Sequence, residues 1–107
     1  MNKIVPDKGL PVLDHLALLA NAGGDRVLAT ELLALFGREI LPGGEQIAGL
    51  ADAAEQRAAA HRLRGAALGI GAAEVAALAA EVEDGSSADR LVEALRRLRA
   101  ALAEPPA

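Results

Sequence analysis

The amino-acid sequence predicts an all-α fold, and three observations lead to that prediction. Aromatic residues are 1% of the 107 residues, and alanine and leucine dominate the hydrophobic 52%, a composition that favours helices over sheets. Leucines recur at spacings of three and four residues, which is the period of an amphipathic helix. Short segments rich in glycine, proline and aspartate separate these stretches. We therefore expect an up-down antiparallel four-helix bundle with a short extra N-terminal helix.

The first two elements are bounded by residues that start and stop helices. An irregular segment is expected over residues 1–12, where prolines and a glycine disfavour regular structure. A short leucine-containing helix follows. Gly23 and Gly24 end it, because glycine accepts the left-handed conformation found at helix ends, and Asp25 can cap the next first turn. The second helix is therefore expected to begin near Arg26.

The middle of the chain contains a helix breaker. The second helix meets Pro42-Gly43-Gly44, and proline removes a backbone hydrogen bond and clashes with the preceding turn. We expect the helix to kink or end there. The apolar period resumes at Ile47, Leu50 and Ala51, which indicates one broken helical arm rather than two domains.

Three further helices complete the predicted bundle. Asp52 is placed to cap a helix over residues 53–70, which would be roughly 27 Å long. Gly69 and Gly71 mark its end, and a turn over 84–87 separates the last two helices. Their apolar stripes are Val75, Leu78 and Val82 in the first, and Leu91, Leu95, Leu98 and Leu102 in the second. The helical domain thus covers residues 13–103, and a disordered tail is expected over 104–107.

Composition excludes several classes of function. The net charge is -4, which is the wrong sign for a protein that binds a nucleic-acid backbone. No stretch approaches the roughly 20 apolar residues of a membrane span. There is no cysteine, so thiol chemistry and cysteine-based zinc sites are excluded. The first residues lack the apolar core of a secretory signal, and we expect a cytoplasmic protein.

The arginines of the last helix allow two interpretations. A basic amphipathic helix is one, and a solvated face that covers Leu95 and Leu98 is the favoured one. These arginines are Arg90, Arg96, Arg97 and Arg99.

The two histidines have different surroundings. His15 lies in the short first helix without neighbouring cations or glycine, which favours a packing or surface role. His61 lies in the middle of the long helix, and Arg57, Arg64, Gly65 and Leu68 fall within roughly 60° of it on the helix surface. The opposite face is apolar and consists of Ala59, Leu63, Ala66, Ala67 and Ile70. We therefore expect the His61 imidazole to be exposed.

The His61 face has the features that phosphorylation of a ring nitrogen requires. Gly65 costs about 1 kcal/mol relative to alanine in a helix interior, which suggests a need for open space. Arg57 and Arg64 can donate charge-assisted hydrogen bonds to phosphoryl oxygens, and their field favours a neutral, nucleophilic imidazole. From spacing alone, a solvated helix face that carries these residues by chance is an equal alternative.

One segment of the long helix resembles a known motif. It reads Ala60-His61-Arg62-Leu63-Arg64-Gly65-Ala66-Ala67-Leu68-Gly69-Ile70-Gly71-Ala72. This is similar to the motif of the histidine-containing phosphotransfer domain of multistep two-component signalling. Upstream, Leu13-Asp14, the segment from Gly23 to Phe36 and Pro42 resemble the opening of that family. The likeness covers about residues 13–103. Arg64 stands where the family most often has lysine, and the stretch from Leu50 to His61 is short.

The resemblance implies a phosphocarrier rather than an enzyme. His61 would be the phosphoacceptor, Arg64 the neighbouring cation and Gly65 the clearance glycine. The phosphoryl group would come from a receiver-domain aspartate and pass to another receiver. The implied partners are response-regulator receiver domains and a hybrid histidine kinase. No cofactor is expected, and Mg²⁺ would be supplied by the receiver.

A docking surface and a solvated acidic face are also predicted. Leu68, with Ala58 and Ala54 near its edge, would contact the receiver within a ring formed by Arg57, Arg62 and Arg64. No carboxylate cluster is expected around His61, and no metal site is predicted. The acidic residues that follow are assigned to a solvated helix face and are Glu74, Glu81, Glu83 and Asp84.

Two other functions remain as alternatives. The first is a non-catalytic helical adaptor that binds a receiver or kinase without phosphotransfer. It leaves the pairing of His61 with Gly65 unexplained. The second is a dimerising histidine-kinase bundle. It ranks last, because such modules usually have an acidic residue after the reactive histidine, where this chain has Arg62.

Overall fold

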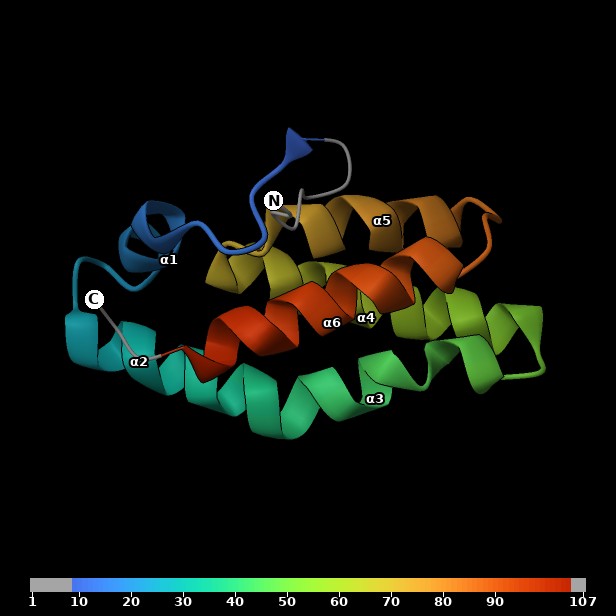
Figure 1. Cartoon of the computed structure of the whole chain (residues 1–107), viewed down its shortest axis with the longest axis horizontal. Coiled ribbons are helices and arrows are strands. Elements are labelled where there is room, and N and C mark those ends of the chain that lie inside the picture. The colour runs from blue at the N-terminus through green and yellow to red at the C-terminus, as the bar shows by residue number, and fades with distance from the viewer. Residues whose placement is uncertain (1–8, 105–107) are drawn as a thin grey trace, which may run out of the picture.

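The computed structural model describes residues 9–104, and all regular structure within them is helical (Figure 1). The α-helices are α1 (His15–Asn21), α2 (Arg26–Leu35), α3 (Leu41–Glu45), α4 (Ala53–Ile70), α5 (Ala73–Glu83) and α6 (Asp89–Ala103). A π-helical turn, η2 (Phe36–Ile40), and a 3₁₀ turn, η3 (Ile47–Gly49), complete the list. The predicted all-α class is confirmed. Most of the expected irregular N-terminal segment and tail, residues 1–8 and 105–107, lies outside the described residues.

The first helix is held against the end of the fourth. Asp14 caps α1 by accepting hydrogen bonds from the N–H groups of Leu16 and Ala17, both at 3.1 Å. The Asp14 N–H donates to the Gly71 carbonyl at 2.8 Å. At the far end of α1, the Asn21 amide donates to the carbonyls of Leu68 and Gly69 at 3.2 and 3.0 Å. These bonds fix α1 across the C-terminal end of α4.

The helix changes from α to π geometry just before the predicted break, and Pro42 does not end it. The Leu41 N–H bonds to the Phe36 carbonyl, five residues back, which makes the π turn. Pro42 then falls in the first turn of α3, where a helix does not need the missing N–H. The chain therefore stays helical through residues 42–44. The prediction that helical structure resumes over Ile47, Leu50 and Ala51 is wrong. The chain forms only the short 3₁₀ turn η3 there, and Leu50 is extended.

The boundaries of the long helix agree with the prediction. Asp52 Oδ1 accepts a hydrogen bond from the Ala54 N–H at 2.8 Å, which caps the first turn of α4. Gly71 adopts φ +80° and ends the helix in the left-handed conformation. Asp25 likewise caps α2, where its carboxylate accepts from the Leu28 N–H at 3.1 Å.

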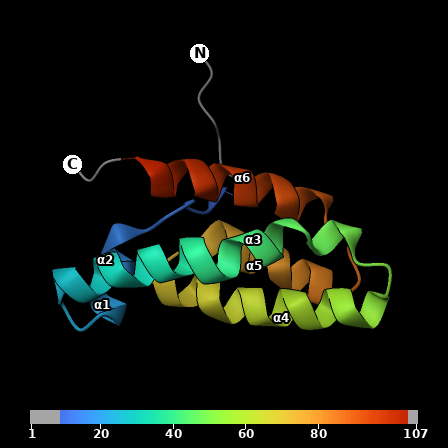
Figure 2. The same cartoon turned by 90° about the horizontal axis from the view of Figure 1, so that it is seen from below.

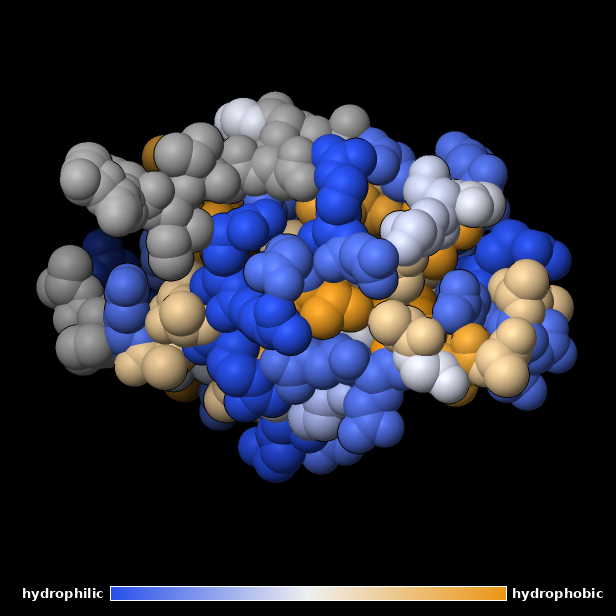
Figure 3. All heavy atoms as spheres, turned by 45° about the vertical axis from the view of Figure 1, so that its right-hand side comes forward, coloured by the Kyte–Doolittle hydropathy of each residue, from blue (hydrophilic) through white to orange (hydrophobic). Residues whose placement is uncertain are grey.

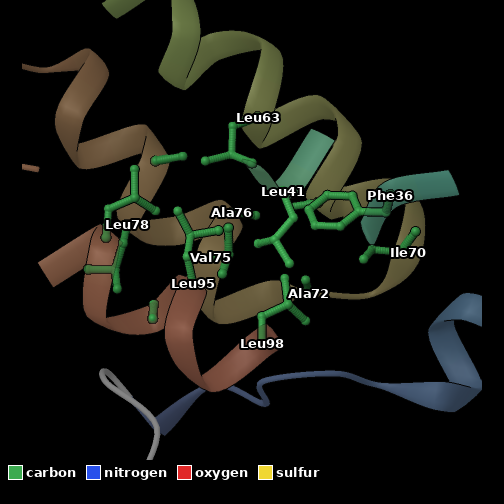
Figure 4. Packing of buried hydrophobic residues seen from close by; sticks show 14 of the residues in the cluster. Phe36, Leu41, Leu63, Ile70, Ala72, Val75, Ala76, Leu78, Leu95 and Leu98 are labelled. Carbon is green, nitrogen blue, oxygen red and sulfur yellow. The ribbon is translucent and has the colours of Figure 1, made fainter. Parts of the chain in front are cut away.

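The core lies between the arm (α2, η2 and α3) and the three later helices. In Figure 2, α4 and α6 lie at opposite edges of the molecule, with α3 and α5 between them. The predicted leucine and valine stripes of α5 and α6 point inward to meet Phe36, Leu41 and Leu63 (Figure 4). Each fully buried leucine contributes roughly 1.5–3 kcal/mol. Gly44 lets the arm approach closely, since a Cβ there would lie 3.3 Å from Leu63.

One acidic residue of the predicted solvated face is fully buried. Glu74 is 0% exposed, and its carboxylate accepts two hydrogen bonds from the Arg97 guanidinium, at 3.2 and 2.7 Å. The prediction for Glu74 is therefore wrong. A buried carboxylate needs a cation and hydrogen bonds to offset its loss of hydration. Here the bidentate arginine of α6 supplies both.

Ion pairs at and near the surface involve every arginine of α6. On the face shown in Figure 3, hydrophilic residues dominate and apolar residues show through in small patches. Each of the four arginines of α6 forms an ion pair, with Glu81, Glu93, Glu74 and Glu45 in order along the helix. Leu95 and Leu98 are buried beneath them, as the solvated-face interpretation predicts. Within residues 9–104, no helix has the length and apolarity needed to cross a membrane.

Candidate functional site

His61 lies on the outward face of α4, as predicted. Its side chain is 67% exposed, while Ala60, Leu63 and Ala67 of the same helix are buried in the core. The apolar side of α4 therefore packs inward and holds the imidazole in solvent. The helix around it is continuous from Ala53 to Ile70, so the Cα position of His61 is set by a rigid element.

A carboxylate from the neighbouring helix contacts the imidazole. Glu83, the last residue of α5, places Oε1 3.0 Å from Nδ1 of His61. The Glu83 side chain is 22% exposed, so it is not part of a freely solvated face. The prediction that Glu83 is only a surface charge is therefore wrong, and this single carboxylate beside His61 was not anticipated.

Arg64 is held by the same carboxylate. Its Nε lies 2.9 Å from Oε2 of Glu83, and its side chain is 41% exposed. Oε2 is buried and has no hydrogen bond of good geometry from any described residue, so the contact with Arg64 is an ion pair. Arg64, Glu83 and His61 thus form a chain of contacts between α4 and α5, which we call the His61 triad.

The triad determines which ring nitrogen can react. An ionised carboxylate can only accept hydrogen bonds, so the contact with Oε1 assigns the proton of the neutral imidazole to Nδ1. Nε2 then carries the lone pair, and no described residue hydrogen-bonds to it. The arrangement presents a nucleophilic nitrogen to solvent and a carboxylate on the far side of the ring. Positive charge that develops on the ring during attack would be stabilised by that carboxylate.

The other predicted cations lie near His61 and have no ion-pair partner among the described residues. Arg57 and Arg62 are exposed, and neither forms an ion pair with a residue between 9 and 104. Arg57 lies one turn before His61, and Arg62 lies beside it on the flank toward the arm. Both guanidinium groups are therefore available to an anion that approaches Nε2.

Gly65 leaves open space one turn after His61. A Cβ built there would meet no atom within 4 Å outside its own helix segment. Neither a backbone conformation nor close packing requires glycine at this position. The predicted clearance beside the imidazole is therefore present.

The predicted docking residues lie along the same face. Leu68 is 56% exposed, and Ala58 is exposed one turn before the histidine. Two shallow grooves of about 410 and 460 Å³ run between α4 and the arm, and they share Glu39 and Ile40 as lining residues. Arg62 lines the first groove. Arg62 therefore lies between the His61 face and this groove, whereas Leu68 and Ala58 line neither groove.

Sequence reasoning missed Glu83, although a usable signal was present. His61 and Glu83 are each eleven residues from Ala72, in the short connection between α4 and α5. When two helices joined by a short turn pack side by side, residues equidistant from the turn lie at the same level. That rule gives the level along the helix axis, but only packing decides which face of α5 turns toward His61.

Neither the second histidine nor any candidate metal site has a comparable set of contacts among the described residues. His15 is exposed at the start of α1 and makes no hydrogen bond with its side chain among residues 9–104. No group of three or more metal-ligating side chains occurs in that part of the chain. Glu83 is already engaged by His61 and Arg64, so the triad does not have the form of a metal site.

The chain was compared with protein-family models, with curated proteins and with solved structures, and none of the three comparisons gives a match.

Proposed function

We propose that this protein is a phosphocarrier of the histidine-containing phosphotransfer type, with His61 as the phosphoacceptor. The arm, α4, α5 and α6 would form the up-down antiparallel four-helix bundle of that family, and α1 the short extra helix. Its partners would be receiver domains and a hybrid histidine kinase in the cytoplasm. The protein would have no nucleotide site and would act as an intermediate rather than as an enzyme.

The observation that supports this proposal most strongly is the orientation of the imidazole. Nδ1 is held by Glu83 at 3.0 Å, while the ring is 67% exposed. A histidine that only packs or solvates a helix face has no need of a carboxylate on one nitrogen and open space around the other. Gly65 supports the same interpretation, as do Arg57 and Arg62, which form no ion pair within residues 9–104, because a phosphoryl group needs room and positive charge.

The proposed transfer is a direct displacement at phosphorus. The Nε2 lone pair attacks the phosphorus of an aspartyl phosphate on the receiver, and an N–P bond forms. The P–O bond to the aspartate breaks, and its electron pair stays on the departing carboxylate. Nδ1 keeps its proton throughout and donates a hydrogen bond to the Glu83 carboxylate. This contact stabilises the positive charge of the phosphorylated ring. The reverse reaction phosphorylates the second receiver.

The surface around His61 suits the docking of such a partner. Leu68 provides an exposed apolar contact, and Arg57 and Arg62 provide positive charge toward the acidic pocket of a receiver. Arg64 differs from the two others because Glu83 already holds it. We therefore assign Arg57 and Arg62 to the partner, and Arg64 to the positioning of Glu83.

A transfer assay tests the proposal. Receiver domains phosphorylated with radiolabelled acetyl phosphate are mixed with the protein, and we expect acid-labile label on the wild type and none on His61→Gln. Circular dichroism should show unchanged helix content in the variant. Label on His61→Gln, or binding of the receivers without any transfer to the wild type, would contradict the proposal. The second outcome would support the helical adaptor instead.

The role of Glu83 has its own test. We expect Glu83→Gln to reduce the transfer rate at least about ten-fold, because the amide removes the negative charge and no longer enforces the Nδ1–H form. Glu81→Gln is the matched control, since Glu81 lies on the same helix and pairs with Arg90 at 3.3 Å. Nitrogen NMR of the imidazole should show the Nδ1–H form in the wild type and in the control. Equal rates for all three proteins would refute the assignment.

A further inference from the structure

A second groove lies between α1 and α2, away from the His61 face. Its walls include His15, Leu16 and Leu19 of α1, and Arg26, Thr30 and Leu33 of α2, and its volume is about 450 Å³. Residues 26, 30 and 33 lie on one flank of α2. Residues 28, 32 and 35 point roughly 160° away from them, by helix geometry. Leu32 and Leu35 line the 460 Å³ groove between α2 and α4. That groove and the α1–α2 groove therefore open on different sides of α2.

The α1–α2 groove has an apolar lining that is unusually exposed. Leu16 is 80% exposed, the highest value among the large hydrophobic residues described. Leu19 and Leu33 are half-buried, and Leu18 and Ala29 close the floor. Leu16 therefore extends the partly buried leucines of the groove into solvent, and an apolar patch of this kind is typical of a contact surface.

Every ionisable residue that lines this groove is basic. They are His15 and Arg26, and no carboxylate contributes to the lining, in a chain whose net charge is -4. The nearest carboxylates in sequence, Asp14 and Asp25, accept backbone hydrogen bonds as helix caps. The groove therefore combines an apolar floor with one arginine and one histidine, and no carboxylate contributes to its lining.

Arg26 is an exposed cation at the start of α2. It directly follows Asp25, whose carboxylate caps the helix and offsets the unfavourable effect of the helix dipole on a cation in the first turn. It forms no ion pair with any residue between 9 and 104. By contrast, the exposed Arg38 pairs with Glu39 at 3.1 Å. An external carboxylate would supply the partner that Arg26 lacks.

We propose that the α1–α2 groove binds an acidic amphipathic segment of a partner protein. Apolar side chains of the segment would cover Leu16, Leu19 and Leu33, and a carboxylate would pair with Arg26. Because this site and His61 lie on different faces, the segment would tether a partner without covering the imidazole. The proposal does not depend on phosphotransfer at His61.

Two synthetic amphipathic peptides test the proposal with the full chain. They share the same leucines at helical spacing, but one carries glutamates and the other lysines at the polar positions. In NMR titrations we expect the glutamate peptide to shift amide signals of α1 and of residues 26–33, and to bind more tightly than the lysine peptide. Absence of binding, or shifts confined to the His61 face, would overturn the proposal.

Charge reversal at Arg26 provides the decisive comparison. Arg26→Glu should lower the affinity for the glutamate peptide about five-fold and raise the affinity for the lysine peptide. The variant should fold, because an acidic residue suits the first turn of a helix. Arg38→Glu is the control and should keep the original preference. An unchanged preference in Arg26→Glu would refute the site, whereas His61→Gln should leave peptide binding intact, which separates this test from the phosphotransfer assay.

Discussion

The chemistry of His61 depends on a side chain 22 residues away in the chain. His15 and His61 are both exposed, but only His61 has a described carboxylate on one ring nitrogen. The two histidines therefore differ in how their rings are held. At His61, the hydrogen bond from Nδ1 orients the ring and leaves Nε2 as the free nitrogen. At His15, the ring is one wall of a groove.

Gly65 sets a balance between stability and access at the residue scale. We expect Gly65→Gln to raise the free energy of unfolding by roughly 0.5–1 kcal/mol, because glycine is a poor helix former and no neighbouring atom opposes the new Cβ. The same side chain should lower the transfer rate, since it occupies the space beside the imidazole. Urea denaturation and the transfer assay measure the two effects.

The control for Gly65 is an exposed position on a distant helix. Ala100→Gln on α6 places the same side chain away from His61 and should leave transfer unchanged. If Gly65→Gln transfers at the wild-type rate, the open space beside His61 has no functional role. If it lowers stability, the helix-propensity argument fails.

At the scale of elements, the junction between α1 and α4 places the end of the histidine helix. Gly71 ends α4 with φ +80°, and a Cβ there would lie 2.5 Å from the Asp14 carbonyl oxygen. Its own carbonyl accepts the Asp14 N–H. A glycine is thus required by both conformation and close approach, and α1 can pack across the end of α4 only because of it.

Replacement of Gly71 should be more costly than replacement of another left-handed glycine. We expect Gly71→Ala to lower the free energy of unfolding by at least about 2 kcal/mol, through backbone strain together with the clash. Gly85 has φ +102° and no atom within 4 Å of a built Cβ, so Gly85→Ala reports strain alone. Chemical denaturation of both variants compares them. Equal losses would show that the contact with Asp14 is not tight.

At the scale of the whole molecule, ion pairs join separate helices. Arg97 and Glu74 link α6 to α5, Arg64 and Glu83 link α4 to α5, and Arg99 links α6 to Glu45 at the end of α3. The last pair is bidentate, with N–O distances of 2.7 and 2.6 Å. The hydrogen bonds from Arg99 lower the pKa of Glu45 below its ordinary value of 4.5.

The Glu45 pair should therefore make stability depend on pH in the acidic range. A carboxyl whose pKa is lower in the folded state stabilises the fold above its unfolded pKa, and this contribution is lost as the pH falls through the folded value. We expect Glu45→Gln to melt at a lower temperature than the wild type at pH 7, and the difference to disappear well below pH 4.5.

Thermal melts followed by circular dichroism across this pH range provide the measurement. Glu39→Gln is the matched control, because Glu39 pairs only with the adjacent Arg38 among the described residues and joins no second element. A Glu45→Gln difference that persists unchanged at pH 3 would contradict the linkage. It would then reflect packing of the side chain rather than its charge.

The parts of this protein that were predictable are those decided by neighbours in the chain. The caps at Asp25 and Asp52, the limits of α4 and the exposure of His61 depend on contacts within a few residues and on helical period. The break predicted at Pro42-Gly43-Gly44 is wrong, because a π turn directly before α3 places Pro42 in a first turn, and that turn depends on how the arm packs.

Tertiary structure alone decided which charges meet between helices. Helical periodicity places a residue on a face of its own helix, but it does not fix the rotation of the neighbouring helix about its axis. That rotation brings Glu83 to His61 and buries Glu74 against Arg97. It is set by the packing of leucines, valines and alanines along the whole core, and so no local pattern around either glutamate could reveal it.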